Sequence, residues 1–361
     1  MFQSRWFNPV LQHSALSRPH LRGARPVGRS LLVAAALSAL AACGPTPEEA
    51  IEEAAAVEAS NREVLVTAAF VRTQGGAAAL AFLPNPDAAS LGLIVSAPRE
   101  GGLDLYDADG ELRTRHAGVR LSGLATAPGF QLRGENLPLI FGASADANAV
   151  LGYAVVTDGI RVLDLPLAET TPSDGVAGLC LHREGAGYVD LVILGNGASA
   201  QIWRIRDAGE DVLHVEQRQS FALTAPARQC ATLDGDIYFA SPASGITRIG
   251  PDGVIEAENN QSVVSLAVGD FNGSRLVLAT DGSTGQVHTF YALDLMPASE
   301  LTIIDGLSTP GIDQPSAIAI TPVSYGFTAY ISGMIAVFDQ EDQRIKVISH
   351  DAASRALVSA D

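Results

Sequence analysis

A repeat of short apolar segments restricts the fold of this chain more than any other feature. Each repeat opens with small and apolar residues, at Ala79–Phe82, Gly123–Thr126, Gly178–Leu181, Gln229–Thr232, Ser265–Val268 and Ala317–Ile320. The third residues of these segments are 44, 55, 51, 36 and 52 residues apart. Each interval is long enough for a sheet of four antiparallel strands.

Two further apolar segments follow each opening segment. The second segments are Leu91–Ser96, Leu137–Gly142, Val189–Leu194, Gly235–Ala240, Ser274–Ala279 and Phe327–Ser332. The third segments follow turn-forming residues and are Gly102–Tyr106, Val150–Tyr153, Gln201–Ile205, Gly245–Ile249, Gln286–Phe290 and Met334–Phe338. Six such units packed radially leave only short, protected edges. Six matched triplets in the same order favour this arrangement over a two-sheet sandwich.

The sequence therefore predicts an all-β fold, a six-bladed β-propeller over residues 63–361. Small residues suit the opening strands because innermost strands crowd around the axis. We expect Glu63–Val71, which precedes the first unit, to supply the missing outer strand of the last unit and so to close the ring.

The first 42 residues have the pattern of an export signal. They contain five arginines and no acid, and end in an apolar run, Ser30–Ala42, that is too short for a comfortable permanent membrane span. The run leads into Cys43-Gly44 and resembles the bacterial lipobox, in which a cysteine receives lipid and becomes the mature N-terminus. We expect lipidation at Cys43, with an ordinary secretory signal as the alternative. Gly44, rather than Asp, implies onward transport to the outer membrane, at its periplasmic face.

Residues 43–62 are rich in glutamate and alanine and are expected to form an acidic linker behind the anchor. The formal net charge of the chain is −17, and without the five N-terminal arginines it becomes −22. So acidic a chain should repel phosphate backbones, which argues against nucleic-acid binding. The lipid anchor is the expected membrane contact, and we expect a monomer.

Two cysteines lie in the opening strands of consecutive units, Cys180 in the third and Cys230 in the fourth. Neighbouring strands could bring them together, and an exported protein meets an oxidising environment. Their positions differ by one register step, which places them on opposite faces of their strands. A disulfide and two buried free thiols both remain open.

Common catalytic motifs are absent from the sequence. It has no Gly-x-Ser-x-Gly, His-Glu-x-x-His, Walker or Rossmann pattern, and the seven histidines are scattered.

Several stretches nevertheless resemble the β-propeller phytases, and the similarity extends over residues 65–348. They are Gly101–Glu111, Gly178–His182 with Gln201–Trp203, Arg218–Gly245, and Ile304–Ser308 with Gly311–Asp313. The resemblance implies calcium-dependent hydrolysis of phytate phosphomonoesters (3-phytase activity), with calcium ions held by carboxylates at one end of the channel.

Most of the calcium ligands that the resemblance implies are replaced in this chain. The expected acids fall on Gly76-Ala77, Arg228, Ser241-Pro242, Val264 and Pro310. Asp305 matches a metal ligand, with a turn-forming Asp-Gly as the alternative, and Arg99 matches a phosphate-binding lysine, with a solvated loop arginine as the alternative. Other phosphate-binding positions fall near Asp146 and Asn196, and Ca²⁺ prefers six to eight oxygen ligands.

Enzymatic activity is therefore left open. If active, the protein is expected to be a phytase-type phosphoric monoester hydrolase that uses calcium. The alternative is a non-catalytic propeller that binds a protein, a glycan or a small ligand, such as a small phosphorylated one, at the cell envelope.

Overall fold

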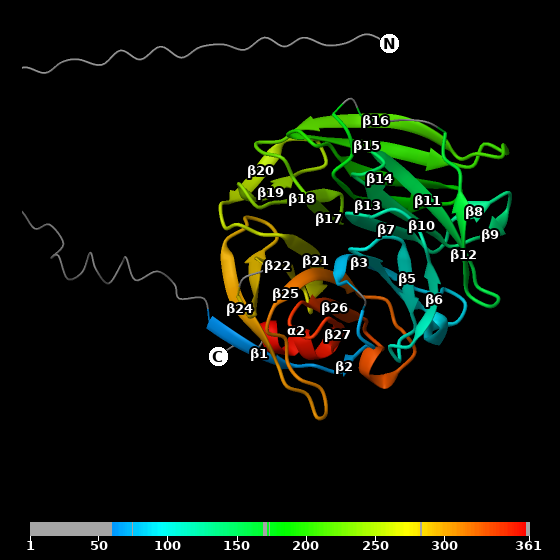
Figure 1. The fold of residues 1–361 in the computed structure, drawn as a ribbon. Helices are drawn as coiled ribbons and strands as arrows, with labels where there is room; N and C mark the ends of the chain where they lie inside the picture. The colour runs from blue at the N-terminus through cyan, green and yellow to red at the C-terminus, as the bar shows by residue number, and fades with distance from the viewer. Residues whose placement is uncertain (1–59, 74, 169–171, 173, 282–283, 359–361) are drawn as a thin grey trace, which may run out of the picture. The chain divides into compact units, whose positions relative to one another are not determined.

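The computed structural model describes residues 60–73, 75–168, 172, 174–281 and 284–358. They form six sheets arranged around a central channel (Figure 1). Blades 1 to 3 contain β3 (Ala77–Leu83), β4 (Leu93–Pro98), β5 (Leu103–Tyr106) and β6 (Leu112–His116); β7 (Gly123–Ala127), β10 (Leu139–Ser144), β11 (Ala149–Val156) and β12 (Arg161–Leu165); and β13 (Gly178–Gly185), β14 (Tyr188–Leu194), β15 (Ser199–Arg206) and β16 (His214–Ala222).

Blades 4 to 6 follow the same order around the ring. They contain β17 (Gln229–Leu233), β18 (Asp236–Ser241), β19 (Gly245–Ile249) and β20 (Ile255–Asn259); β21 (Ser265–Phe271), β22 (Ser274–Thr280), β23 (Gln286–Tyr291) and β24 (Pro297–Ile304); and β25 (Pro315–Thr321), β26 (Met334–Asp339) and β27 (Arg344–Ser349). A small hairpin, β8 (Gln131–Leu132) and β9 (Glu135–Asn136), extends from blade 2. The chain is a six-bladed β-propeller, as the repeat predicts.

The six inner strands β3, β7, β13, β17, β21 and β25 surround the channel. Each contacts the next, and β25 contacts β3, so the ring is closed. Two glycines allow the closest approaches: a Cβ on Gly123 would lie 2.7 Å from the amide nitrogen of Leu179, and one on Gly178 would lie 2.5 Å from the carbonyl oxygen of Arg228. This crowding is the physical reason for small residues at the start of each repeat.

The channel has two ends, which the loops define. On the entry side, loops lead into the inner strands. On the exit side, loops leave them: those of blades 1, 2 and 6 are long (84–92, 128–138 and 322–333), whereas blades 3, 4 and 5 have two-residue turns (186–187, 234–235 and 272–273). The exit end therefore has a high half, where the long loops of blades 6, 1 and 2 project, and a low half, where blades 3, 4 and 5 have short turns.

The N-terminal segment completes two blades. β2 (Ala68–Ala69) pairs with β27 and is the outer strand of blade 6, as the sequence predicts for Glu63–Val71. The preceding residues form β1 (Ser60–Leu65), which pairs in parallel with β24 as a fifth strand of blade 5 (Figure 1). This strand was not expected, and it begins three residues before the predicted domain boundary at residue 63.

The predicted strand assignment is wrong in the sixth unit. Phe327–Ser332 is not a strand, because residues 328–330 form the 3₁₀ turn η2 (Thr328–Tyr330). Met334–Phe338, expected as the third strand, is the second strand β26 of this blade. Tyr325 and Tyr330 are buried against the core between blades 6 and 1, so the apolar residues of this loop pack without forming a sheet.

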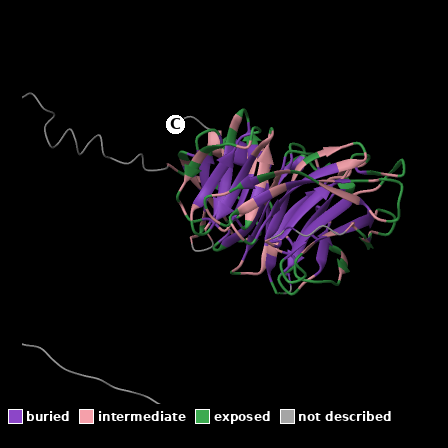
Figure 2. Cartoon of the chain, turned by 90° about the horizontal axis from the view of Figure 1, so that it is seen from above, coloured by how far each residue is buried: buried purple, intermediate pink, exposed green. Residues whose placement is uncertain are grey.

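Apolar clusters fill the spaces between blades, and exposed residues concentrate in the loops (Figure 2). The helix α2 (His350–Val358) follows β27 and contacts β1, β21 and β27 (Figure 1). His350 at its start is stacked on Phe271, with ring centroids 4.9 Å apart. The exit loop of blade 1 contains a second 3₁₀ turn, η1 (Ala89–Leu91). Within the described residues, no helix combines the length and apolar character needed to cross a membrane.

Candidate functional site

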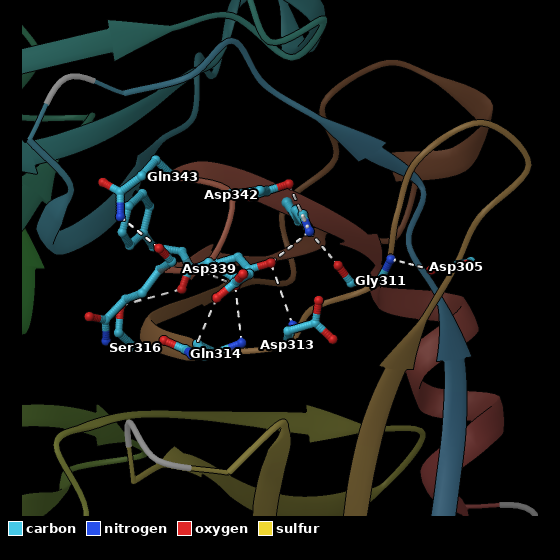
Figure 3. Close-up of polar contacts among 12 residues, drawn as sticks. Asp305, Gly311, Asp313, Gln314, Ser316, Asp339, Asp342 and Gln343 are labelled. Carbon is cyan, nitrogen blue, oxygen red and sulfur yellow. Dashed lines mark hydrogen bonds and ion pairs between the residues drawn. The ribbon is translucent and has the colours of Figure 1, made fainter.

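Asp339, Asp342 and Gly311 lie close together in a polar cluster on the entry side of blade 6 (Figure 3). The cluster contains Lys346, the only lysine of the chain. The Lys346 ammonium lies 2.7 Å from Asp339 Oδ2 and 3.0 Å from Asp342 Oδ2, and donates to the Gly311 carbonyl oxygen. The side chains of Lys346 and Asp339 are each 1% exposed. A protein ammonium therefore supplies the positive charge among these carboxylates.

Backbone donors complete the coordination of Asp339. Its Oδ1 accepts from the amides of Gln314 and Glu341 at 3.0 and 3.1 Å (Figure 3). Its Oδ2 accepts from the Asp313 amide at 3.5 Å in addition to Lys346. The carboxylate thus joins the loop before β25 to the turn between β26 and β27, which is a structural role.

Asp305, the predicted metal ligand, lies in the same loop before β25, where its side chain stabilises a local turn. Its Oδ1 accepts the Gly311 amide at 2.7 Å (Figure 3). This contact links Asp305 to the Lys346 cluster only through the backbone of Gly311. The structure therefore does not give Asp305 the converging oxygen neighbours that Ca²⁺ requires.

Arg99, the predicted phosphate ligand, lies in blade 1 directly after β4, and its backbone amide donates to the Gly76 carbonyl at 3.1 Å. Asp146 forms a two-contact ion pair with Arg120, at 2.6 and 2.9 Å. No interaction among the described residues joins Arg99 to Asp305. The candidate residues thus occupy the entry side without forming one site.

A metal centre is not assembled in the described part of the chain. No three side chains of the His, Cys, Asp and Glu types come together there in a way that could hold a metal ion. The carboxylates of Asp339 and Asp342 already share the Lys346 ammonium, so in the described part of the chain this pair does not offer the free set of oxygen ligands that the calcium ions implied by the phytase resemblance need. Cys43, the predicted lipidation site, lies outside the described residues.

The channel itself encloses a cavity of about 340 Å³ lined by all six inner strands. Its wall is mostly aliphatic and includes Ala81, Ala125, Ala231, Ala267 and Ala319. Among the described residues that line it, Glu184 is the only one with an ionisable side chain. Burial raises the pKa of Glu184, although the hydrogen bond from the Gly129 amide opposes this effect.

A disulfide crosslinks the channel wall. Cys180 on β13 and Cys230 on β17 are bonded, with Cα atoms 5.6 Å apart, and both line the cavity. Residues at equal register positions point toward the same side of their blades, so residues that face each other between blades must differ by an odd step. The one-residue offset of the two cysteines is therefore what a bond between neighbouring blades requires.

Four large apolar side chains are exposed in the exit loops of blades 1 and 6, and we call Leu91, Val323, Phe327 and Ile331 the exit-loop patch. They are 64%, 45%, 37% and 68% exposed. The exit loops of blades 1 and 6 lie side by side here. The hydroxyl of Tyr325, in the loop of blade 6, donates to the carbonyl of Leu93 at the start of β4 in blade 1, at 3.0 Å.

Comparisons with known proteins support the fold. No family model matches the chain, and no curated protein matches it. A solved structure of U3-55K is similar over 78% of this chain and 98% of its own, with 11% identity and a TM-score of 0.51. The β-propeller domain of Cps50 (Swd1) from Myceliophteria thermophila is similar over 79% and 99%, with 12% identity and a TM-score of 0.49. At such identities the likeness concerns the fold alone.

Sequence reasoning missed three features of the structure. Lys346 was visible as the only lysine, but its partners come from separate segments of the chain. Glu184 and the exit-loop patch were missed because no local pattern marks a channel wall or an exposed loop residue.

Proposed function

We propose that this chain is a non-catalytic propeller that binds a partner protein through the exit-loop patch. The observation that carries the proposal is the exposure of four large apolar side chains on two braced loops. Contiguous exposed apolar surface on a soluble fold commonly marks an interaction site. Loops fixed by a rigid ring can present such a surface without a large ordering cost.

The charges around the patch indicate the chemistry of the partner. Neither exit loop, 84–92 or 322–333, contains lysine or arginine. Asp87 lies in one of these loops, and Asp109 is close enough to Tyr330 to contribute to its raised pKa, after the larger effect of burial. The whole chain has a net charge of −17. We therefore infer a partner segment with apolar side chains flanked by lysine or arginine.

The Lys346 cluster supports a non-catalytic role. A phytase-type reaction needs divalent cations to bring a polyanionic substrate to an acidic protein. In the entry-side cluster the cationic group is an ammonium held by Asp339, Asp342 and Gly311. Calcium-dependent phosphate release is accordingly the competing outcome in the test below.

We further propose that lipid on Cys43 anchors the domain at the periplasmic face of the outer membrane. The order of basic, apolar and small residues before Cys43 supports an anchor. The Cys180–Cys230 bond is consistent with an oxidising compartment.

Site-specific photocrosslinking tests the partner proposal in intact cells. A photoreactive benzoylphenylalanine replaces Ile331 in the full chain, and a matched variant places it at Leu293, which is 74% exposed in the turn between β23 and β24. We expect one discrete adduct from position 331, recovered with membranes, and none from position 293.

The partner identified in this way is then titrated against the purified protein. Leu91→Asp together with Ile331→Asp should weaken binding at least tenfold, whereas Leu293→Asp should leave it unchanged. Equal adducts at both positions, or binding that is insensitive to the patch variant, would contradict the docking site. Phosphate release from phytate that millimolar calcium stimulates would overturn the non-catalytic role, and an adduct in the soluble fraction would contradict the anchor.

A further inference from the structure

The channel cavity has the dimensions and wall chemistry of a small-molecule site. Its volume of about 340 Å³ falls at the lower end of the range of ligand pockets, roughly 300–1,000 Å³. Small side chains such as Ala125 and Ala319 leave this space open along the axis. Two wall hydroxyls are already used: Thr126 donates to the Phe82 carbonyl at 2.6 Å and Thr232 to the Leu181 carbonyl at 2.8 Å. The lining side chains are mostly aliphatic, and polar atoms still form a large part of the exposed wall.

One carboxyl group, that of Glu184, lies among these aliphatic side chains. Glu184 lies near the exit end of β13, beyond a bulge between Leu181 and Arg183. The Gly129 amide donates to its Oε1 at 2.7 Å and fixes the group. In the described part of the chain, Oε2 receives no hydrogen bond. Bulges often re-aim side chains at functional positions, and this one precedes the one acid among the described residues that line the cavity.

The two ends of the channel differ in access. On the entry side the side-chain amide of Gln229 in blade 4 donates to the Ser122 carbonyl, which precedes blade 2, at 2.8 Å. On the exit side, blades 3, 4 and 5 have only two-residue turns after their inner strands. A ligand can therefore approach from the low half of the exit side, where Glu184 lies.

We propose that the channel binds a small apolar molecule that carries one protonated amine, with the amine on Glu184 and the apolar part among the alanines. The charge balance excludes an anionic ligand, because one acid and no base line the described wall. The carboxylate would accept charge-assisted hydrogen bonds from an ammonium group. This site is separate from the exit-loop patch and does not depend on the partner protein.

Calorimetric titration of the full chain with three matched probes tests the site. The probes are hexylammonium, hexanol and hexanoate, which share an alkyl chain and differ in charge. We expect hexylammonium to bind at least tenfold more tightly than hexanol, and hexanoate not to bind. Glu184→Gln should remove the preference for the ammonium while leaving the weak binding of hexanol.

Channel-filling variants separate this site from the rest of the surface. Ala231→Leu places a larger side chain at a half-buried position of the wall, and Ala319→Leu does the same on β25, in case the first variant fails to fold. Either folded variant, checked by its melting transition, should lose hexylammonium binding. The absence of hexylammonium binding, or an affinity that Glu184→Gln leaves unchanged, would overturn the proposal whether or not the patch binds a protein.

Discussion

Lys346 is the residue whose environment most clearly sets this propeller apart from a calcium-binding one. Its ammonium is buried between two carboxylates and a carbonyl oxygen, and Asp339 is buried with it. Removing one partner of a buried pair leaves an unpaired charge, whereas replacing all partners can be nearly neutral. We therefore expect a single substitution in the Lys346 cluster to lower the stability of the fold strongly, and a joint substitution of the lysine and its carboxylates to lower it much less.

We predict that Lys346→Met lowers the free energy of unfolding by about 3–5 kcal/mol, because Asp339 would remain charged and buried. Urea denaturation measures this loss. The matched control is the triple variant Lys346→Met, Asp339→Asn and Asp342→Asn, which should recover a large part of the stability. A single variant as stable as the natural chain would show that the ammonium is not needed there.

At the residue scale, the sequence identified Arg99 and Asp305 by alignment to a family pattern. Asp305 does lie beside the Lys346 cluster, but it contacts only the backbone of Gly311, whose carbonyl oxygen accepts from Lys346. Asp339 and Asp342 had no motif to reveal them, because their partner Lys346 and their backbone donors come from different loops. Long-range ion pairs of this kind depend on tertiary packing, which residue types in one segment do not encode.

At the scale of elements, the inner strands and most second and third strands follow from apolar periodicity. The exceptions have physical reasons. Residues 327–332 carry the composition of a strand, but Gly326 and Gly333 have positive φ angles and the loop packs its tyrosines beneath blade 1. β1 is polar and pairs with residues 299–304, more than 230 positions away, so no local signal predicts its partner.

The Cys180–Cys230 bond links two such elements and closes a loop with a sequence separation of 50. By the chain-entropy argument, a crosslink of this length contributes about 4 kcal/mol. We predict that Cys180→Ala with Cys230→Ala lowers the urea midpoint of unfolding, and that dithiothreitol lowers the midpoint of the natural chain to a similar value. Reductant should not affect the double variant. A natural chain indifferent to reductant would mean that the bond does not stabilise the ring.

At the scale of the whole molecule, closure of the ring depends on residues that enter before blade 1. The repeat predicted six blades and a closing strand, because six units of matched order have one favourable radial packing. It could not predict the channel ligand site or the exit-loop patch, since both arise only when distant loops and strands surround a common space. The sequence thus predicts the fold, whereas the channel site and the exit-loop patch can be recognised only in the folded structure.

Truncation at the N-terminus tests how far the closing segment holds the ring together. Val64, Val66 and Phe70 are each at most 5% exposed, and burying such side chains contributes roughly 1.5–3 kcal/mol apiece. A chain that begins at Thr67 loses β1 only, and one that begins at Arg72 loses β2 as well. The first chain lacks Val64 and Val66, and we expect it to unfold cooperatively at a clearly lower melting temperature. The second also lacks Phe70, and we expect a broad, non-cooperative transition, because the total lost approaches the usual stability of a domain. A chain that begins at Ser60 is the control and should melt as the full chain does. Cooperative unfolding of the chain that begins at Arg72 would show that contact between β25 and β3 alone closes the ring.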